Sequence, residues 1–149
     1  MNINVRPFKA EDISKILADG IIECGVKSSG NEFIKRISKE YEADGLSMTV
    51  TLDDQIMGCG GVALFWKGVG ELWAMFSRDI IKYPIETVKQ TKRALQKIMD
   101  DNDLHRVQCY VRSDLTAQGF VETLGFKAEG VAEKYTHDKV DCTLYSIVR

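Results

Sequence analysis

The sequence contains no long apolar run, no leader-like apolar stretch near its start and no pair of closely spaced cysteines. A helix that spans a bilayer needs roughly 20 mostly apolar residues, so we expect no membrane-spanning segment and no membrane partner. The chain opens on MNINVRPFKAEDI, which is polar and charged and therefore predicts no secretory signal. We expect the protein to be cytoplasmic.

An excess of positive charge is also missing. The chain carries 20 Lys and Arg residues against 22 Asp and Glu residues, for a formal net charge of -2. Proteins that bind nucleic acid usually present a strong positive field to its phosphates. The composition therefore predicts no nucleic-acid partner.

The four cysteines, Cys24, Cys59, Cys109 and Cys142, are far apart in the sequence and form no CxxC pair. A zinc site normally uses closely spaced ligand pairs, and only two histidines are present to add to them. Three of the four cysteines stand in apolar, strand-like segments, where a reduced and buried thiol is the simpler interpretation. We expect neither a metal site nor a disulfide.

Apolar residues make up 44% of the chain, which is enough for a buried core and argues against disorder. The length of 149 residues fits one domain of ordinary size. No internal repeat, low-complexity stretch or linker divides the sequence. The prediction is a single domain over residues 1–149.

Hydrophobic periodicity predicts the element order β-α-α-β-β-β-α-β-α-β-β, because strands alternate with a period of two and helices recur every three or four residues. The predicted strands cover 2–8, 46–52, 55–66, 71–77, 105–111, 126–135 and 140–148. The predicted helices cover 10–18, 31–44, 84–101 and 115–124. Residues 20–30 give no clear pattern, although GVKSSGN favours a loop. This order predicts a mixed sheet with helices on its faces.

Glycines mark several boundaries. Gly20 and Gly45 each stand where a helix is expected to end, and Gly45 suits a left-handed cap. Gly58, Gly60 and Gly61 interrupt the strand predicted over 55–66. Glycine inside a strand often marks a bulge or a close approach of two backbones, and we expect one of these here.

Four segments carry a resemblance to a known family. NVRPFKAEDI is similar to a first strand followed by an acidic helix start, and DLTAQGFVETLGFKAEG to an Asn-x-x-Ala helix that leads into Leu-Gly-Phe, here Leu124, Gly125 and Phe126. GELWAMFSRDIIKYP and DKVDCTLYSIVR are similar to a subgroup often encoded by bacteriophages, in which an Asp and a Tyr recur where Asp141 and Tyr145 stand. Together these segments resemble the Gcn5-related N-acetyltransferases, the GNAT superfamily.

The resemblance implies an α/β fold with a mixed, mostly antiparallel, seven-stranded sheet. It also implies helices on both faces and a splay between the fourth and fifth strands, 71–77 and 105–111. The implied function is acetyl transfer from acetyl-CoA, as co-substrate, to a primary amine of a small molecule or peptide by direct attack in a ternary complex. The alternative is a catalytically inactive GNAT-fold binding or virion-associated structural protein. Transfer of a longer acyl group is a third interpretation.

By the same resemblance, acetyl-CoA pairs with the backbone near Met75, Phe76 and Ser77, inside the splay. Its pyrophosphate is expected at the start of the helix over 84–101, where free N–H groups and the helix dipole attract an anion.

The pyrophosphate loop falls on residues 81–86, so the implied contacts are Lys82, Tyr83, Ile85 and Glu86. This loop contains no glycine, unlike the usual family loop, and Pro84 lacks an N–H group. The subgroup resembled above shares this altered loop. The competing interpretation is that Tyr83-Pro84 starts an ordinary core helix and Glu86 stabilises its dipole.

Asp114 stands where the family often has an asparagine, which implies a contact with the pantetheine arm or nearby backbone. The simpler interpretation is that Asp114 caps the helix predicted over 115–124. The exposed strand edges and Trp66 leave a homodimer open as an alternative to a monomer.

Glu71 is the candidate general base, because family members often carry an acidic base on the fourth strand. A solvated glutamate at the end of a hairpin is the alternative. The tyrosine that commonly serves as the acid has no counterpart, since its place is taken by Val121. Tyr110, Tyr135 and Tyr145 are the candidates to replace it.

Overall fold

The computed structural model describes residues 1–19, 21–24, 31–114 and 117–149. In chain order the elements are β1 (Ile3–Pro7), α1 (Glu11–Asp19), β2 (Ile21–Cys24), α2 (Asn31–Asp44), β3 (Ser47–Leu52), β4 (Gln55–Trp66), β5 (Val69–Ser77), the 3₁₀ helix η1 (Arg78–Lys82), α3 (Pro84–Asp101), β6 (Arg106–Arg112), α4 (Ala117–Thr123), β7 (Lys127–Ala132) and β8 (Cys142–Val148). No helix within these ranges is long and apolar enough to cross a membrane.

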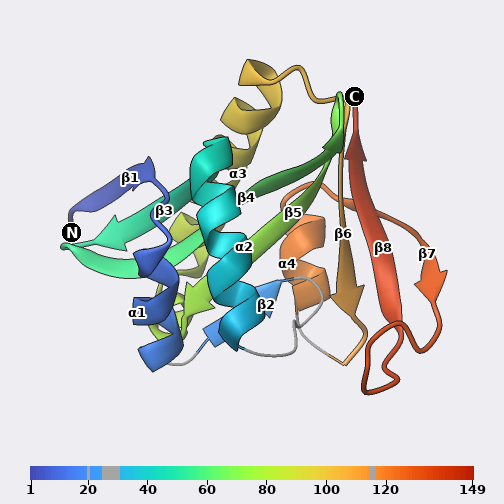
Figure 1. Ribbon diagram of the computed structural model, residues 1–149, viewed down its shortest axis with the longest axis horizontal. Coiled ribbons are helices and arrows are strands. Elements are labelled where there is room, and N and C mark those ends of the chain that lie inside the picture. Colours follow the sequence, from blue (N-terminus) through green and yellow to red (C-terminus); the bar gives the residue numbers. More distant parts are fainter. Residues whose placement is uncertain (20, 25–30, 115–116) are drawn as a thin grey trace.

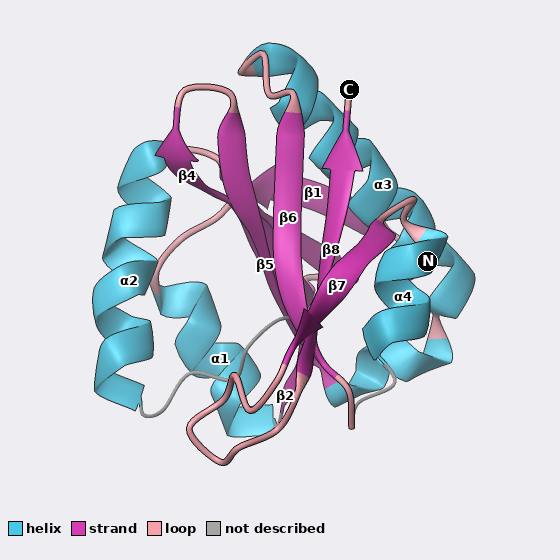
Figure 2. Cartoon of the chain, turned by 90° about the vertical axis from the view of Figure 1, so that its right-hand side faces the viewer, coloured by secondary structure: helices cyan, strands magenta, loops and turns pink. Residues whose placement is uncertain are grey.

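One mixed sheet forms the centre of the molecule. Its main path follows the order β1-β3-β4-β5-β6-β8-β7, and β2 pairs with β5 off this path. Among the described strands, β5 and β6 form the one parallel pair. Helices α1 and α2 cover one face, and α3 and α4 cover the other (Figures 1 and 2). The seven-stranded path confirms the predicted fold class, and β2 is an eighth strand that the periodicity did not predict.

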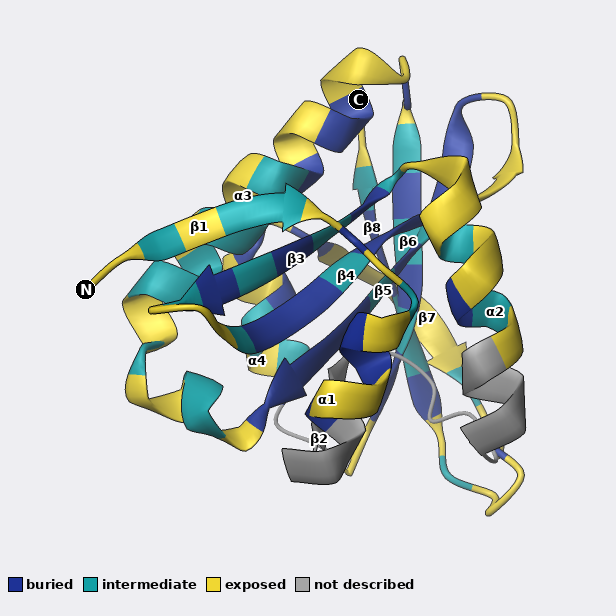
Figure 3. Ribbon diagram, turned by 60° about the vertical axis from the view of Figure 1, so that its left-hand side comes forward, coloured by how far each residue is buried: buried dark blue, intermediate teal, exposed yellow. Residues whose placement is uncertain are grey.

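Two apolar clusters hold the helices to the sheet. Because side chains alternate along a strand, β5 contributes to both clusters. Phe76 packs with Leu95 of α3 in the larger cluster, whereas Met75 packs with Cys59 of β4 and Ile13 of α1 on the opposite face. Buried residues follow the central strands (Figure 3). The alternation expected from the sequence therefore places both cores.

The cysteines whose side chains the structure describes form no disulfide with one another. Cys59, Cys109 and Cys142 are buried thiols, as predicted for residues in apolar strands. Burial raises the pKa of the Cys59 thiol well above its ordinary value. The Cys59 thiol therefore remains protonated, and all three buried side chains pack as small apolar groups.

Most predicted boundaries lie within two residues of the observed ones. β5 begins at Val69, two residues before the predicted start, because Val69 and Gly70 pair with β6. The strand predicted over 126–135 ends earlier, at Ala132. Gly20 and most of the predicted loop lie outside the described residues.

The glycines at the end of α2 and within β4 have the structural roles that the sequence predicted. Gly45 has φ +70°, which confirms the left-handed cap after α2. A Cβ on Gly61 would lie 2.2 Å from the carbonyl oxygen of Leu46, so two backbones meet there too closely for a side chain. The β3–β4 register also shifts between Val50 and Thr51, opposite the stretch that contains Gly58. Both a bulge and a close approach are present.

A buried carboxylate ties β1, β3 and α1 together. Asp12 is fully buried and accepts two hydrogen bonds from Arg6, both 2.8 Å long. It also accepts the backbone N–H of Lys9 at 3.0 Å and the Thr49 hydroxyl at 2.8 Å. Burial alone raises the pKa of Asp12, but the Arg6, Lys9 and Thr49 donors outweigh it, so the pKa is lowered overall.

We predict that Asp12→Ala lowers the free energy of unfolding by about 2–4 kcal/mol, because it leaves Arg6 and Thr49 without their partner. Since the folded pKa is depressed, this contribution is present above the pKa of an unfolded aspartate and is lost as the pH falls through the folded pKa. Urea unfolding at neutral and acidic pH measures both effects. Ala in place of the exposed Glu11 is the matched control, and equal losses in the two variants would contradict the assignment.

Candidate active site

The parallel strands β5 and β6 pair over a short stretch and then separate. The pairs are Val69 with Arg106, Gly70 with Val107 and Glu71 with Gln108, and the β5–β6 pairing ends there. Both strands continue, β5 to Ser77 and β6 to Arg112. The predicted splay is therefore present, and Glu71 stands at its vertex.

The edge of β5 inside the splay is already paired. Ala74, Met75, Phe76 and Ser77 lie opposite Cys24, Glu23, Ile22 and Ile21 of β2, in antiparallel register. Figure 1 shows β2 between the end of β5 and α4. The resemblance implied that the backbone groups at Met75, Phe76 and Ser77 are free for the pantetheine arm. This expectation is wrong, because the segment between the first two helices forms a strand that pairs with them.

An aromatic stack flanks Glu71 on the β5 side. Tyr41 of α2 stacks on Trp73, with ring centroids 4.8 Å apart and planes 20° apart. Phe8 also contacts Trp73, in an edge-on arrangement with ring centroids 5.2 Å apart. Trp73 lies two residues beyond Glu71 and so on the same face of the sheet. Burial raises the pKa of Glu71. Burial and, after it, the charge of Glu71 raise the pKa of Tyr41.

A second stack flanks Glu71 on the β6 side. Tyr110 of β6 and Tyr135 of the β7–β8 connection stack with centroids 4.3 Å apart and planes 17° apart. Burial first and then the Glu71 charge raise the pKa of Tyr135, which places that hydroxyl in the field of the carboxylate. The two stacks and Glu71 therefore form a cluster on the α1–α2 face, which we call the vertex site: Tyr41, Glu71, Trp73, Tyr110 and Tyr135.

The other tyrosine considered from the sequence lies elsewhere. Tyr145 is buried in the core beneath α3 and α4, and its hydroxyl donates to Glu122 at 2.9 Å. Val121 is fully buried in the same core. Tyr145 therefore faces away from Glu71, and the geometry leaves Tyr110 and Tyr135 as the tyrosines beside the splay.

The start of α3 is the expected pyrophosphate site. Ser77 accepts the N–H of Asp79 and so caps the 3₁₀ helix η1, and Lys82 pairs with Asp79 at 2.9 Å. No side chain caps α3. Pro84 is its first residue, so Ile85 and Glu86 supply the first amides of the helix.

The side chains of this turn point to different partners. Ile85 is 83% exposed, and Glu86 accepts a hydrogen bond from Gln90 at 2.7 Å. The carbonyl of Tyr83 accepts both the backbone N–H and the hydroxyl of Thr87. These hydrogen bonds are those of an ordinary helix start. The backbone N–H groups of Ile85 and Glu86, in the first turn, point along the axis of α3 towards its N-terminal end.

No protein-family sequence profile matches the chain, and no curated protein matches its sequence. Solved structures do match. An acetyltransferase of the GNAT family from Streptococcus pneumoniae has a TM-score of 0.74 at 14% identity, covering 99% of this chain and 100% of that one. Ribosomal-protein-alanine N-acetyltransferase from Brucella melitensis has a TM-score of 0.77 at 12% identity, covering 98% and 99%. Mycobacterium smegmatis RimJ in complex with CoA-disulfide has a TM-score of 0.71 at 15% identity, covering 98% and 81%.

This chain has the GNAT fold. At identities of this size the likeness extends to the fold alone. Within that fold, β5 and β6 are the fourth and fifth strands predicted from the sequence, and the vertex site lies where they separate.

Asp114 was expected to contact the pantetheine arm. In the structure its carboxylate is bound by Arg112. Arg112 donates to both Asp114 oxygens, at 3.0 and 2.9 Å, and to both Asp138 oxygens, at 3.1 and 2.9 Å. The hydrogen bonds from Arg112 lower the pKa of Asp114 and, with a further bond from Thr136, that of Asp138. α4 begins at Ala117, three residues after Asp114, so Asp114 is not the residue directly before the helix, where an N-cap was expected. Arg112 thereby links Asp114 to Asp138, on the connection that carries Tyr135.

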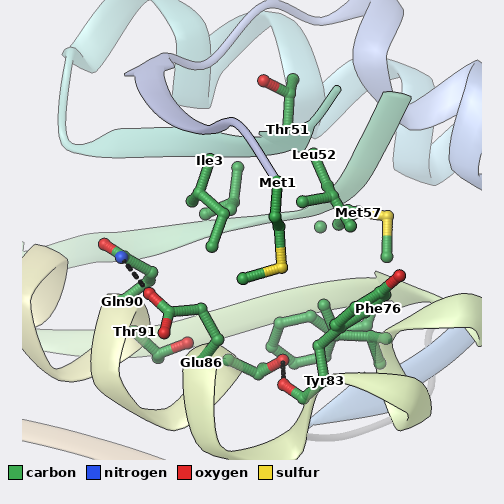
Figure 4. A pocket seen from close by; sticks show the side chains of 14 residues that line it. Met1, Ile3, Thr51, Leu52, Met57, Phe76, Tyr83, Glu86, Gln90 and Thr91 are labelled. Carbon is green, nitrogen blue, oxygen red and sulfur yellow. Dashed lines mark hydrogen bonds between the residues drawn. The ribbon is translucent and has the colours of Figure 1, made fainter. Parts of the chain in front are cut away.

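A separate hollow lies under α3. It encloses about 420 Å³ including space open to solvent, and Figure 4 shows Met1, Ile3 and Leu52 on one side of it, with Tyr83 and Glu86 on the other. A second hollow of about 460 Å³ adjoins it beneath α3. Glu71 lines neither. These hollows are therefore distinct from the vertex site.

We predict that Tyr41→Ala brings the pKa of Glu71 down towards its ordinary value, because removal of the ring admits water to the carboxylate. The side-chain carboxyl carbon of Glu71, followed by NMR through a pH titration, measures this pKa. Tyr145→Phe, on the opposite face, is the control and leaves the midpoint unchanged. An unperturbed Glu71 in the wild-type protein would overturn the burial of the vertex site.

Proposed function

We propose that the protein is an N-acetyltransferase that uses acetyl-CoA to acetylate a primary amine of a small molecule or peptide, with Glu71 as general base. The observation that carries this proposal is the position of Glu71, at the vertex of the splay and between two aromatic stacks. A carboxylate whose pKa is raised by burial is a candidate for acid–base chemistry. The GNAT fold supports the reaction class.

The vertex site suits an ammonium group. A cation is attracted both to the Glu71 carboxylate and to the ring faces of Tyr41 and Tyr135. The raised pKa makes Glu71 a better proton acceptor than an exposed glutamate. Glu71 takes the proton from the substrate ammonium, directly or through a water, and the neutral amine can then attack a carbonyl.

Acetyl-CoA, when bound, supplies the thioester carbonyl that the amine attacks. The uncapped start of α3 supports a pyrophosphate there, through the amides of Ile85 and Glu86 and the positive charge of Lys82. Pro84 removes one donor, and the Glu86 carboxylate opposes an anion. The pantetheine arm can pair with the β5 edge only if β2 has left it. The residues present therefore suit the pyrophosphate in part, and they suit the pantetheine arm only without β2.

A second candidate is a non-catalytic GNAT-fold binding or virion-associated protein. The pairing of β2 with the β5 edge and the proline at the first position of α3 favour it. A shared fold does not by itself confer catalysis. The two candidates differ in whether the protein binds acetyl-CoA.

We predict that acetyl-CoA stabilises the folded protein, because a ligand that binds only the folded state shifts the unfolding equilibrium. At 100 times the dissociation constant the gain is about 2.7 kcal/mol, which thermal unfolding detects as a higher Tm. ADP, which has a pyrophosphate but no pantetheine, is the control ligand. An unchanged Tm at millimolar acetyl-CoA would favour the non-catalytic candidate.

We predict that Glu71→Gln lowers kcat by about 10²–10⁴-fold with little change in acetyl-CoA affinity, because it removes the base and keeps the shape. In the wild-type protein the rate falls as the pH drops through the Glu71 pKa, since the base must be deprotonated, and the variant lacks this limb. Thiol release from acetyl-CoA measures turnover with three acceptors: a peptide with a free N-terminus, an N-blocked lysine peptide and a small diamine.

Glu122→Gln is the matched control, because Glu122 lies on α4 and contacts Tyr145 on the opposite face. It keeps wild-type turnover. Retention of full activity by Glu71→Gln with every accepted substrate would remove Glu71 from the mechanism.

A further inference from the structure

The edge of β5 beyond Glu71 presents one row of backbone N–H and C=O groups. Each such row can pair with one extended chain at a time. On its other edge, β5 pairs with β4 over the same stretch, for example Phe76 with Gly58. Only the edge within the splay is left for another partner, and β2 holds it through four residue pairs.

β2 itself has few attachments. It is four residues long, and among the described strands it pairs with β5 alone. Helix α4 lies beside it (Figure 1). A short strand with a single partner belongs to the least stable part of a sheet, since it can separate without breaking any other pairing. The main-path strands on both sides of the splay keep their own antiparallel neighbours in either case.

We propose that β2 is an intramolecular gate on the cofactor site: it pairs with β5 over Ala74–Ser77, and acetyl-CoA occupies that edge only in molecules whose β2 has left it. This inference rests on the proposed function, because it assigns the same edge to the pantetheine arm. Strand and cofactor then exclude each other. Whatever weakens β2 pairing therefore strengthens the apparent binding of the cofactor, up to the affinity of the open form.

The gate predicts a measurable change in affinity. If β2 holds the edge in nine molecules of ten, the apparent Kd for the cofactor is raised about tenfold over that of the open form. Successive N–H groups of a strand point to opposite edges, so one of two adjacent residues directs its N–H towards β5. Proline at Ile22 or at Glu23 therefore deletes a donor to β5 in one of the two variants and disfavours the strand in both.

The probe is desulfo-coenzyme A, which carries the pantetheine arm and pyrophosphate but no reactive thiol. Calorimetry measures its Kd for the wild-type protein, Ile22→Pro, Glu23→Pro and the control Ile22→Val, which preserves the strand. We expect at least one proline variant to bind about tenfold more tightly than the wild type, and the valine variant to match it. Cooperative thermal unfolding confirms that each variant is folded.

The outcomes separate the gate from the proposed function. Equal affinities in all four proteins would overturn the gate and leave cofactor binding intact. An absence of binding in folded proline variants would overturn the gate and the proposed function together. Tighter binding confined to the proline variants supports both.

A covalent lock provides a second route if the proline variants fail to fold. Cys24 lies opposite Ala74, which borders the hollow beneath α3, so Ala74→Cys introduces a thiol with space around it. Oxidation joins the two sulfurs, with loss of two electrons and two protons to an added disulfide reagent that is itself reduced to thiols. The locked protein is expected to lose desulfo-coenzyme A binding and to regain it after reduction. Undiminished binding in the locked protein, or failure of the bond to form, would overturn the gate.

Discussion

The separation of β5 from β6 is the constraint on which the rest of the molecule depends. Where two strands part, the backbone groups facing the gap lose their partners, and buried groups of this kind are costly unless something pairs with them. In this chain β2 supplies the pairing at Ala74–Ser77. A ligand with an extended amide backbone could supply it equally well. The fold therefore leaves the β5 edge in need of hydrogen-bond partners, which either a segment of the chain or a cofactor can provide.

The same separation produces the electrostatics of the vertex site. Glu71 is the last β5 residue paired with β6, so it sits where the sheet is still continuous and partly shielded from water. That shielding raises its pKa. Just beyond it the strands part, and each arm carries an aromatic stack. One geometric feature thus places a partly buried carboxylate of raised pKa between two aromatic stacks, which supports the proposed role of Glu71 as general base.

The sequence predicted the parts of this arrangement that depend on local pattern. The strand over 55–66 and the helix over 84–101 were predicted with the bounds that the structure has, because each is a long segment with apolar residues at many positions. β2 was missed, since four residues without alternation carry no such signal and pair only because β5 lies beside them. Glu71 was identified by resemblance. The stacking of Tyr41 on Trp73 depends on tertiary packing that no local pattern contains.

The two departures from a typical cofactor site differ in kind. Pro84 and Glu86 are fixed by the sequence, so their effect on pyrophosphate binding is present in every molecule. The pairing of β2 is an equilibrium, so its effect scales with the fraction of molecules in which the edge is covered. The two act at opposite ends of the cofactor and share no side chain, so their free-energy costs should be nearly additive. The altered loop determines how tightly the form with an open β5 edge binds the cofactor. The pairing of β2 determines what fraction of the molecules is in that form. Weak cofactor binding is therefore compatible with the role proposed for the vertex site.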